Sequence, residues 1–269
     1  MNDTIGFIGA GNMGGAIISG LLAGGKRASK DIIVADSRTE ALAVLDEKYP
    51  GIRTTQNNAE AASSGILVLA VKPQVYQSVI HAIREDVSPE TIIVTIAAGL
   101  TLAAVTDWFG GSRKIVRTMP NTPALVSEGM TAISPGPGMK DEEIQAVRNI
   151  FDAVGRTVVL PESHMDAYTS LAGSSPAFVF MFLESLADGA VREGIPRKMA
   201  YEIAAQALLG SAKLMLETGR HPGELKDMVC SPGGTTIEAV ATLEASGFRS
   251  ALIEAVSDCT ARAKELGRA

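Results

Sequence analysis

The chain has 269 residues, a net charge of −6 and two cysteines. It contains no block of basic residues, so no broad surface could attract a nucleic-acid backbone or an anionic membrane. Two cysteines do not form a disulfide framework, and the sequence reaches a glycine-rich motif without a secretory signal pattern. The apolar stretch 92–105 is too short to span a bilayer. We therefore expect a cytoplasmic protein with no nucleic-acid partner and no membrane partner.

Short β-rich runs alternate with helical patterns over the first part of the chain. We expect strands at 4–8, 32–35, 66–71, 91–96 and 114–118, and helices at 12–23, 39–48, 74–84 and 101–109. The 66–71 run is continuously apolar, which is typical of a strand buried on both faces. A loop at 135–138, a helix at 141–154 and a strand at 157–160 follow. This alternation predicts an α/β domain with a parallel, doubly wound sheet.

Helical periodicity alone continues beyond residue 162. Apolar residues recur at helical spacing along 200–215 and 252–266, and Phe178–Leu183 is apolar at every position. A helix that is apolar all round must be covered, and a small helical domain offers few neighbours to cover it. We therefore predict an α/β domain over 1–161 and an all-helical domain over 162–269 that self-associates. The alternative is that these helices pack only against the first domain.

The motif Gly9-Ala10-Gly11-Asn12-Met13-Gly14 is a G-x-G-x-x-G that joins the first expected strand to the first expected helix. In a Rossmann-type fold the first glycine permits a tight turn, the second lets the backbone approach a pyrophosphate, and the third lets helix and strand pack closely. The helix N-terminus adds free N–H groups and the positive end of the helix dipole. The motif predicts dinucleotide binding, and the alternative is a purely structural turn.

The choice of nicotinamide cofactor stays open on the sequence. Asp36 lies 22 residues after Gly14, at the end of the second expected strand. An acid at this position normally binds the ribose 2′-hydroxyl of NAD. Ser37 and Arg38 follow immediately and could hold the 2′-phosphate of NADP. The acid therefore supports NADH as cofactor, and the neighbouring base supports NADPH. The alternative interpretation of Arg38 is a solvated surface charge.

A second motif, Ser231-Pro232-Gly233-Gly234-Thr235-Thr236-Ile237-Glu238, combines a tight loop with a helix start. Thr235 and Glu238 have the spacing of a capping box, so we expect a helix to begin at Thr235. Its free N–H groups and the nearby hydroxyls would form a cradle for one carboxylate. An ordinary capped helix is the alternative interpretation. The three histidines are scattered without metal-ligand spacing, so we expect no metal site.

These motifs together resemble the pyrroline-5-carboxylate reductase family over essentially the whole chain. The resemblance is carried by Phe7–Met13, Ala70–Pro73, Met119–Pro123, Gly173–Ala177 and Asp227–Thr236. It implies an N-terminal Rossmann-type doubly wound sheet and a C-terminal helical domain that dimerises by interleaving helices, with dimers assembling further into a decamer. It also implies NADPH, or NADH, as cofactor and a small cyclic imine as substrate.

The resemblance assigns site residues in both domains. Cofactor contacts are implied for Gly9, Ala10, Gly11, Asn12, Met13, Gly14, Ser37, Arg38, Asn57, Ala70, Val71, Lys72, Pro73, Ala97 and Ala98. The substrate carboxylate is expected on Ser231, Gly234, Thr235 and Thr236. Thr236 is similar to the family's threonine whose hydroxyl meets the ring nitrogen, and we expect it to be the catalytic residue. Phe178 stands where a tyrosine is usual, and Asp36 where a neutral residue is common.

The expected chemistry is direct hydride transfer to the imine carbon, which yields L-proline in the last step of proline biosynthesis. A protonated imine is already electrophilic, so the enzyme would act mainly by proximity and alignment. One alternative is a 3-hydroxyacid dehydrogenase of similar build, whose family uses a lysine followed four residues later by asparagine. No lysine of this sequence has asparagine at that spacing. Another alternative is a non-catalytic NAD(P) sensor, which would leave the second anion cradle without a purpose.

Overall fold

The computed structural model describes residues 3–267, which divide into two compact units. The first unit runs to Ser174 and resumes at Cys259, and the second unit is Ser175–Asp258. The predicted boundary at 161/162 differs from this division, because a helical stretch before Ser174 packs with the sheet and the end of the last helix contacts that stretch. We keep 1–161 and 162–269 as proposed functional domains, and describe each compact unit by itself.

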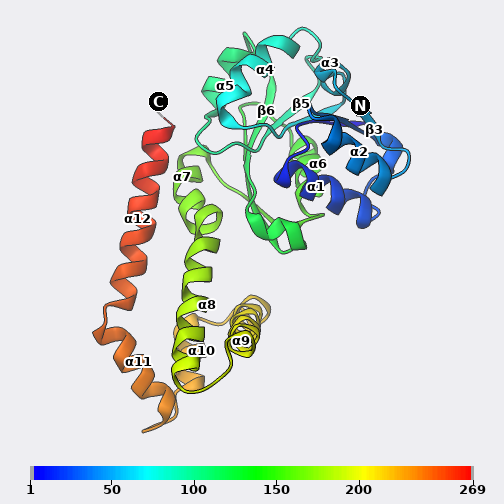
Figure 1. The fold of residues 1–269 in the computed structure, drawn as a ribbon. Helices are drawn as coiled ribbons and strands as arrows, with labels where there is room; N and C mark the ends of the chain where they lie inside the picture. The colour runs from blue at the N-terminus through cyan, green and yellow to red at the C-terminus, as the bar shows by residue number, and fades with distance from the viewer. Residues whose placement is uncertain (1–2, 268–269) are drawn as a thin grey trace. The chain divides into compact units, whose positions relative to one another are not determined.

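The first unit is built on a sheet of eight strands in the order β3-β2-β1-β4-β5-β6-β7-β8 (Figure 1). The strands are β1 (Ile5–Ile8), β2 (Ile32–Ala35), β3 (Arg53–Thr55), β4 (Ile66–Leu69), β5 (Ile92–Thr95), β6 (Lys114–Met119), β7 (Gly129–Pro135) and β8 (Gly155–Val159). The helices of this unit are α1 (Asn12–Ala23), α2 (Thr39–Lys48), α3 (Asn58–Ala62), α4 (Tyr76–Ile83), α5 (Leu102–Trp108), α6 (Asp141–Phe151) and α7 (Met165–Tyr168). The α/β class and the doubly wound arrangement are thus confirmed.

Two apolar clusters fill the two faces of this sheet. Phe7 packs with residues of α1, α2 and α6 on one face. Ile8, the next residue along β1, packs with residues of α3, α4 and α5 on the other face. Successive residues of a strand point to opposite faces, so a strand in the middle of such a sheet must be apolar throughout. β4 is buried at all four positions, which confirms the prediction for the 66–71 run.

The sheet departs from the prediction at both of its edges. β7 pairs antiparallel with β6, so the sheet is parallel only from β3 to β6 and again between β7 and β8. No long crossover helix separates β6 from β7, and a short connection of this kind suits an antiparallel neighbour. β3, β7 and the five-residue α3 have no counterpart in the sequence prediction. β3 is a short edge strand of polar residues, which carries neither apolar alternation nor an apolar run.

The second unit is helical and exposes much apolar surface. It contains α8 (Ser175–Arg192), α9 (Arg197–Thr218), α10 (Pro222–Val229), α11 (Thr235–Ala245) and the first part of α12 (Phe248–Leu266). Helices α8 and α9 pack together, yet only Ala187, Ala200 and Ala204 are buried among the described residues of α8 to α12. Phe180, Met181 and Ile253 each expose about two thirds of their surface, at 65%, 67% and 67%. A single chain leaves these helices uncovered.

One helical stretch, Glu162–Arg192, is long and apolar enough to cross a membrane by length and composition. It spans α7, a π-helical segment at Thr169–Ser174, and α8. Only 11% of its most apolar window is buried in the chain. The most membrane-like segment of residues 3–267 is therefore this helix rather than the 92–105 stretch considered from the sequence. A helix that is covered by another protein surface can have the same length and the same apolar composition.

Candidate active site

The three glycines of the G-x-G-x-x-G motif meet different surroundings at the start of α1. A Cβ on Gly9, whose φ is +106°, would lie 2.5 Å from the Ala70 carbonyl oxygen, and a Cβ on Gly14 would lie 2.5 Å from the Gly9 carbonyl oxygen. These two glycines are therefore required by the packing of the chain on itself. A Cβ on Gly11 would have no described atom within 4 Å. Gly11 leaves open space that protein atoms do not fill, as expected where a phosphate approaches the backbone.

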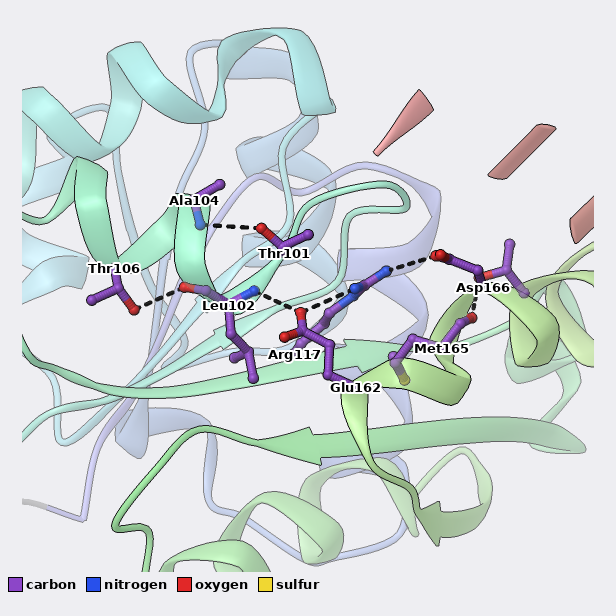
Figure 2. A network of polar contacts seen from close by, with 9 residues as sticks. Thr101, Leu102, Ala104, Thr106, Arg117, Glu162, Met165 and Asp166 are labelled. Atoms are coloured by element: carbon purple, nitrogen blue, oxygen red, sulfur yellow. Dashed lines mark hydrogen bonds and ion pairs between the residues drawn. The ribbon is translucent and has the colours of Figure 1, made fainter. Parts of the chain in front are cut away.

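The N-terminus of α1 is free to bind an anion. Its cap residue, Gly11, offers no side-chain hydrogen bond, and no acidic residue stands in the first turn of the helix. The N-terminus of α5 differs, because Thr101 Oγ1 accepts a hydrogen bond from Ala104 N and Glu162 Oε1 accepts one from Leu102 N, at 3.1 and 2.7 Å (Figure 2). Unsatisfied N–H groups and the dipole at α1 are what a pyrophosphate needs.

A cavity of about 680 Å³ adjoins the glycine loop at the carboxyl ends of the strands. Its lining residues are Ile8, Gly9, Gly11, Asn12, Ala35, Asp36, Ser37, Arg38, Gln56, Asn58, Ala70, Val71, Lys72, Val75 and Val79. Eight of the predicted cofactor residues are among them: Gly9, Gly11, Asn12, Ser37, Arg38, Ala70, Val71 and Lys72. The structure thus brings five of the nine residues predicted for the adenosine and pyrophosphate half together with three of the six predicted for the nicotinamide half. A larger cavity of about 1070 Å³, between α5 and the ends of β7 and β8, shares no residue with it.

The other predicted cofactor residues do not line this cavity. They are Ala10, Met13, Gly14, Asn57, Pro73, Ala97 and Ala98. Gly14 contributes by packing, as described above, and Asn57 caps α3 by accepting a hydrogen bond from Ala59 N at 3.1 Å. The neighbouring Gln56 and Asn58 line the cavity instead. Sequence reasoning missed both, because β3, which brings them to this edge, has no sequence signature.

Asp36 and Arg38 form a bidentate ion pair at the edge of the cavity. Asp36 Oδ1 accepts hydrogen bonds from Arg38 N and Nε at 2.9 and 3.0 Å, and Oδ2 accepts from Arg38 Nη2 and Ala10 N at 2.9 and 2.7 Å. Burial by itself would raise the pKa of the Asp36 carboxyl, but the hydrogen bonds from Arg38 and Ala10 together hold it below its ordinary value. Asp36 is therefore ionised and tied to the glycine loop.

Tyr76 forms hydrogen bonds through its hydroxyl at the carboxyl ends of both β4 and β5. Its side chain is fully buried, and its hydroxyl donates to the Leu69 carbonyl and accepts a hydrogen bond from Ile96 N at 3.3 Å. Burial raises the pKa of the Tyr76 phenol well above its ordinary value, so the hydroxyl keeps its proton. The segments that follow these strands, 70–73 and 97–98, are those predicted to line the nicotinamide half. Tyr76 thus holds both segments by one hydroxyl.

We expect Tyr76→Phe to lower both stability and turnover. The substitution leaves a buried carbonyl and a buried N–H without their partner, at a cost of about 1–3 kcal/mol. It also loosens the two segments relative to each other, so kcat should fall severalfold with a smaller change in the KM for the imine. Tyr168→Phe is a matched control, because its buried hydroxyl donates to the Met130 carbonyl at 2.6 Å, away from β4 and β5. Equal kcat values in the two variants would contradict this role.

A buried arginine links β6 to the helical stretch that follows the sheet (Figure 2). Arg117 is 5% exposed, and it contacts Glu162 Oε1 at 3.1 Å and Asp166 Oδ1 at 3.4 Å. Its position precedes Met119–Pro123, one of the motifs that carry the resemblance. Within that motif, Asn121 donates to the Ala172 carbonyl and accepts from Met130 N, at 2.9 Å in both cases. This motif therefore holds the π-helical segment against the sheet.

The predicted carboxylate cradle lies in the second unit. Gly234 N donates to the Ser231 carbonyl at 3.0 Å, and Gly233 has a φ of +63° within this turn, which suits glycine. α11 begins at Thr235, as predicted, but the capping box is wrong. Gly234 is the cap residue and has no side chain with which to cap the helix, and Thr235 already lies inside the first turn. The first N–H groups of α11 therefore stay available for an anion, beside the half-buried Thr236.

The fold and the glycine loop define the class of protein, an NAD(P)-dependent oxidoreductase with a Rossmann-type domain. Family comparison agrees, because residues 4–99 match the family described as NADP oxidoreductase, coenzyme F420-dependent. Residues 162–266 match the family described as pyrroline-5-carboxylate reductase dimerisation. The chain is 46% identical to pyrroline-5-carboxylate reductase of Escherichia coli over 269 residues, the full length of both. It belongs to the pyrroline-5-carboxylate reductase family, which confirms the resemblance.

Further relatives and solved structures agree with this assignment. The chain is 46% identical to pyrroline-5-carboxylate reductase of Methanosarcina acetivorans over 268 residues, which is 99% of each chain. The pyrroline-5-carboxylate reductase structure from Coxiella burnetii superposes with a TM-score of 0.94 at 33% identity, covering 99% of both chains. The Plasmodium falciparum pyrroline carboxylate reductase with NADP bound superposes with a TM-score of 0.87 at 29% identity, covering 99% of this chain and 98% of that one.

Proposed function

We propose that this chain reduces 1-pyrroline-5-carboxylate to L-proline with NADPH, or NADH, as the reductant, in the last step of proline biosynthesis. Membership of the pyrroline-5-carboxylate reductase family over the full chain carries this proposal. The cofactor residues support it, since Gly11 leaves open space beside an uncapped helix N-terminus and eight predicted residues share one cavity. The decisive assay follows NADPH and NADH oxidation in parallel with pyrroline-5-carboxylate as substrate.

We assign the chemistry to two groups of residues. When bound, the reduced nicotinamide supplies a hydride to the imine carbon, and the ring nitrogen, protonated beforehand, becomes a secondary amine. The glycine loop and α1 hold the pyrophosphate, while 70–73 and 97–98 set the plane of the ring that donates. Ser231, Gly234 and Thr235 hold the carboxylate through the turn and the first N–H groups of α11. Catalysis then comes from alignment, which needs no strong acid in the site.

Thr236 is the proposed catalytic residue, and Thr236→Ala tests it. The hydroxyl would hydrogen-bond the ring nitrogen and keep the imine protonated and aligned. Loss of one such hydrogen bond, about 1–1.5 kcal/mol, should reduce kcat/KM for the imine roughly tenfold while the Kd for NADPH stays unchanged. Thr242→Ala is the control, because Thr242 lies on the same helix and its hydroxyl donates to the Glu238 carbonyl, at 3.2 Å. Unchanged turnover in Thr236→Ala would refute the role.

The alternatives make different predictions in the same assay. A non-catalytic sensor would bind NADPH without oxidising it when offered the imine. A 3-hydroxyacid dehydrogenase would reduce NAD(P) with a 3-hydroxyacid and would ignore the imine. Prephenate dehydrogenase of Aquifex aeolicus and a ketol-acid reductoisomerase share the architecture at 12–14% identity, and such similarity shows the fold alone.

We also propose how the chain assembles and where it works. The dimerisation domain supports a homodimer in which the exposed apolar faces of α8 to α12 cover each other. Further assembly of dimers into a decamer remains our proposal, and light scattering would measure the subunit number. A cytoplasmic location is supported by the composition, and the one helix among residues 3–267 that could span a membrane falls within the dimerisation domain.

A further inference from the structure

The Asp36 carboxylate has no acceptor capacity left. A carboxylate offers about four lone-pair positions. All four are used by Arg38 N, Arg38 Nε, Arg38 Nη2 and Ala10 N, at 2.7 to 3.0 Å. The Asp36 side chain is also only 7% exposed, so water does not compete for these positions. A ribose hydroxyl could bind Asp36 only by displacing Arg38 or the glycine loop.

Arg38 is the group that this arrangement leaves available. Its side chain is 58% exposed and lines the cavity, and Asp36 engages only its Nε–H and one Nη2–H. A guanidinium has five N–H donors, so three of them remain for a ligand. A free arginine at the surface would sample many rotamers, and the two parallel contacts to Asp36 fix the plane of its fork. A planar fork in a fixed orientation suits a phosphate.

We propose that Asp36 is a positioning residue that orients Arg38 for the 2′-phosphate of NADPH, and is not the ribose ligand that an acid at this place ordinarily is. This inference rests on the proposed use of a nicotinamide cofactor and adds the direction of its selectivity. The two roles of Asp36 predict opposite preferences between NADH and NADPH. A ribose ligand selects NADH and repels the extra phosphate, whereas a positioning acid selects NADPH, because its charge is neutralised by Arg38.

Asp36→Asn separates the two roles in a direct binding experiment. An amide keeps the shape, but its NH₂ faces donors of Arg38, so the fork is released while one oxygen can still accept from Ala10 N. The Kd values of NADPH and NADH are measured by titration of nucleotide fluorescence, without imine. We expect the ratio of the NADH Kd to the NADPH Kd to fall about fivefold or more. A ratio that rises or stays constant would overturn the proposal.

The variant Arg38→Gln tests whether Asp36 acts on the 2′-phosphate through Arg38. In that background Asp36→Asn should leave the ratio of the two Kd values unchanged, because Asp36 acts on the phosphate only through Arg38. An equal fall in both backgrounds would contradict the assigned route. Retained NADH binding shows that each variant is folded. The proposed function is tested separately by imine-dependent NADPH oxidation of the unaltered chain, so failure of one proposal is distinguishable from failure of the other.

Discussion

Replacing Gly11 by alanine should leave the protein folded and remove most of its cofactor binding. The Gly11 backbone has a φ of −74° and a ψ of −173°, which alanine adopts freely, and its Cβ would meet no described atom within 4 Å. The methyl group would instead occupy the space where a phosphate must approach the N–H groups of α1. Loss of two charge-assisted hydrogen bonds, about 1.5–3 kcal/mol each, should weaken NADPH binding at least about 100-fold.

Gly14→Ala is the matched comparison within the same loop. Its Cβ would lie 2.5 Å from the Gly9 carbonyl oxygen and 3.1 Å from the Ala70 Cβ, so this methyl group collides with the protein itself. We expect Gly14→Ala to lower the melting temperature and Gly11→Ala to preserve it. Calorimetry and NADPH titration on both variants measure the difference. Strong NADPH binding by a folded Gly11→Ala protein would show that the pyrophosphate does not bind at this loop.

An acidic residue in the apolar surface of the second unit should dissociate the proposed dimer. Ile253 and Phe180 expose 67% and 65% of their surface in the single chain, and both lie within the dimerisation domain. Burying an unpaired carboxylate costs several kcal/mol, and a twofold interface would bury two. We expect Ile253→Glu and Phe180→Glu each to raise the dimer dissociation constant by about 10³-fold or more, measured by light scattering over a range of concentrations.

Val44→Glu provides the control for that experiment. Val44 is 62% exposed on α2 of the first unit, so it receives the same charge at a comparably exposed apolar position. This variant should remain a dimer. Retention of the dimer by both Ile253→Glu and Phe180→Glu would mean that association uses other surfaces, and it would remove the physical reason for the exposed apolar residues.

The elements with strong local signals were predictable from the sequence. The bounds of α1, β2 and α2 agree with the predicted ranges residue by residue, because a glycine turn, an apolar run and a helical pattern adjoin there. β3 was missed because three polar residues at a sheet edge carry no periodicity, and Gln56 and Asn58 were missed with it. β7 was missed as a strand because its run 129–135 mixes glycine, threonine, serine and proline with apolar residues, and its antiparallel direction depends on the connection rather than on the strand itself.

The site shows the same division between local and long-range information. The open space at Gly11 follows from the motif. The relation between Asp36 and Arg38, which support different cofactors, could be found only from the structure. Sequence spacing treated them as separate ligands, and the structure shows one ion pair whose carboxylate also binds Ala10 N. The capping box at Thr235 failed for a related reason. Spacing alone does not reveal whether a residue caps a helix or lies in its first turn, and Gly234 takes the capping position.

The return of α12 to the first unit has a consequence for how this fold is assembled from parts. The chain leaves the first unit after Ser174 and re-enters it at Cys259, and these two side chains touch, with Sγ and Oγ 3.3 Å apart. Thr260 and Ser170 hold the same junction at 2.8 Å. The helical unit is therefore an inserted domain whose two ends lie close together. If it were removed, a short loop could join Ser174 to Cys259. A nucleotide-binding domain with such an insertion point could carry a different inserted domain and so bind a different substrate.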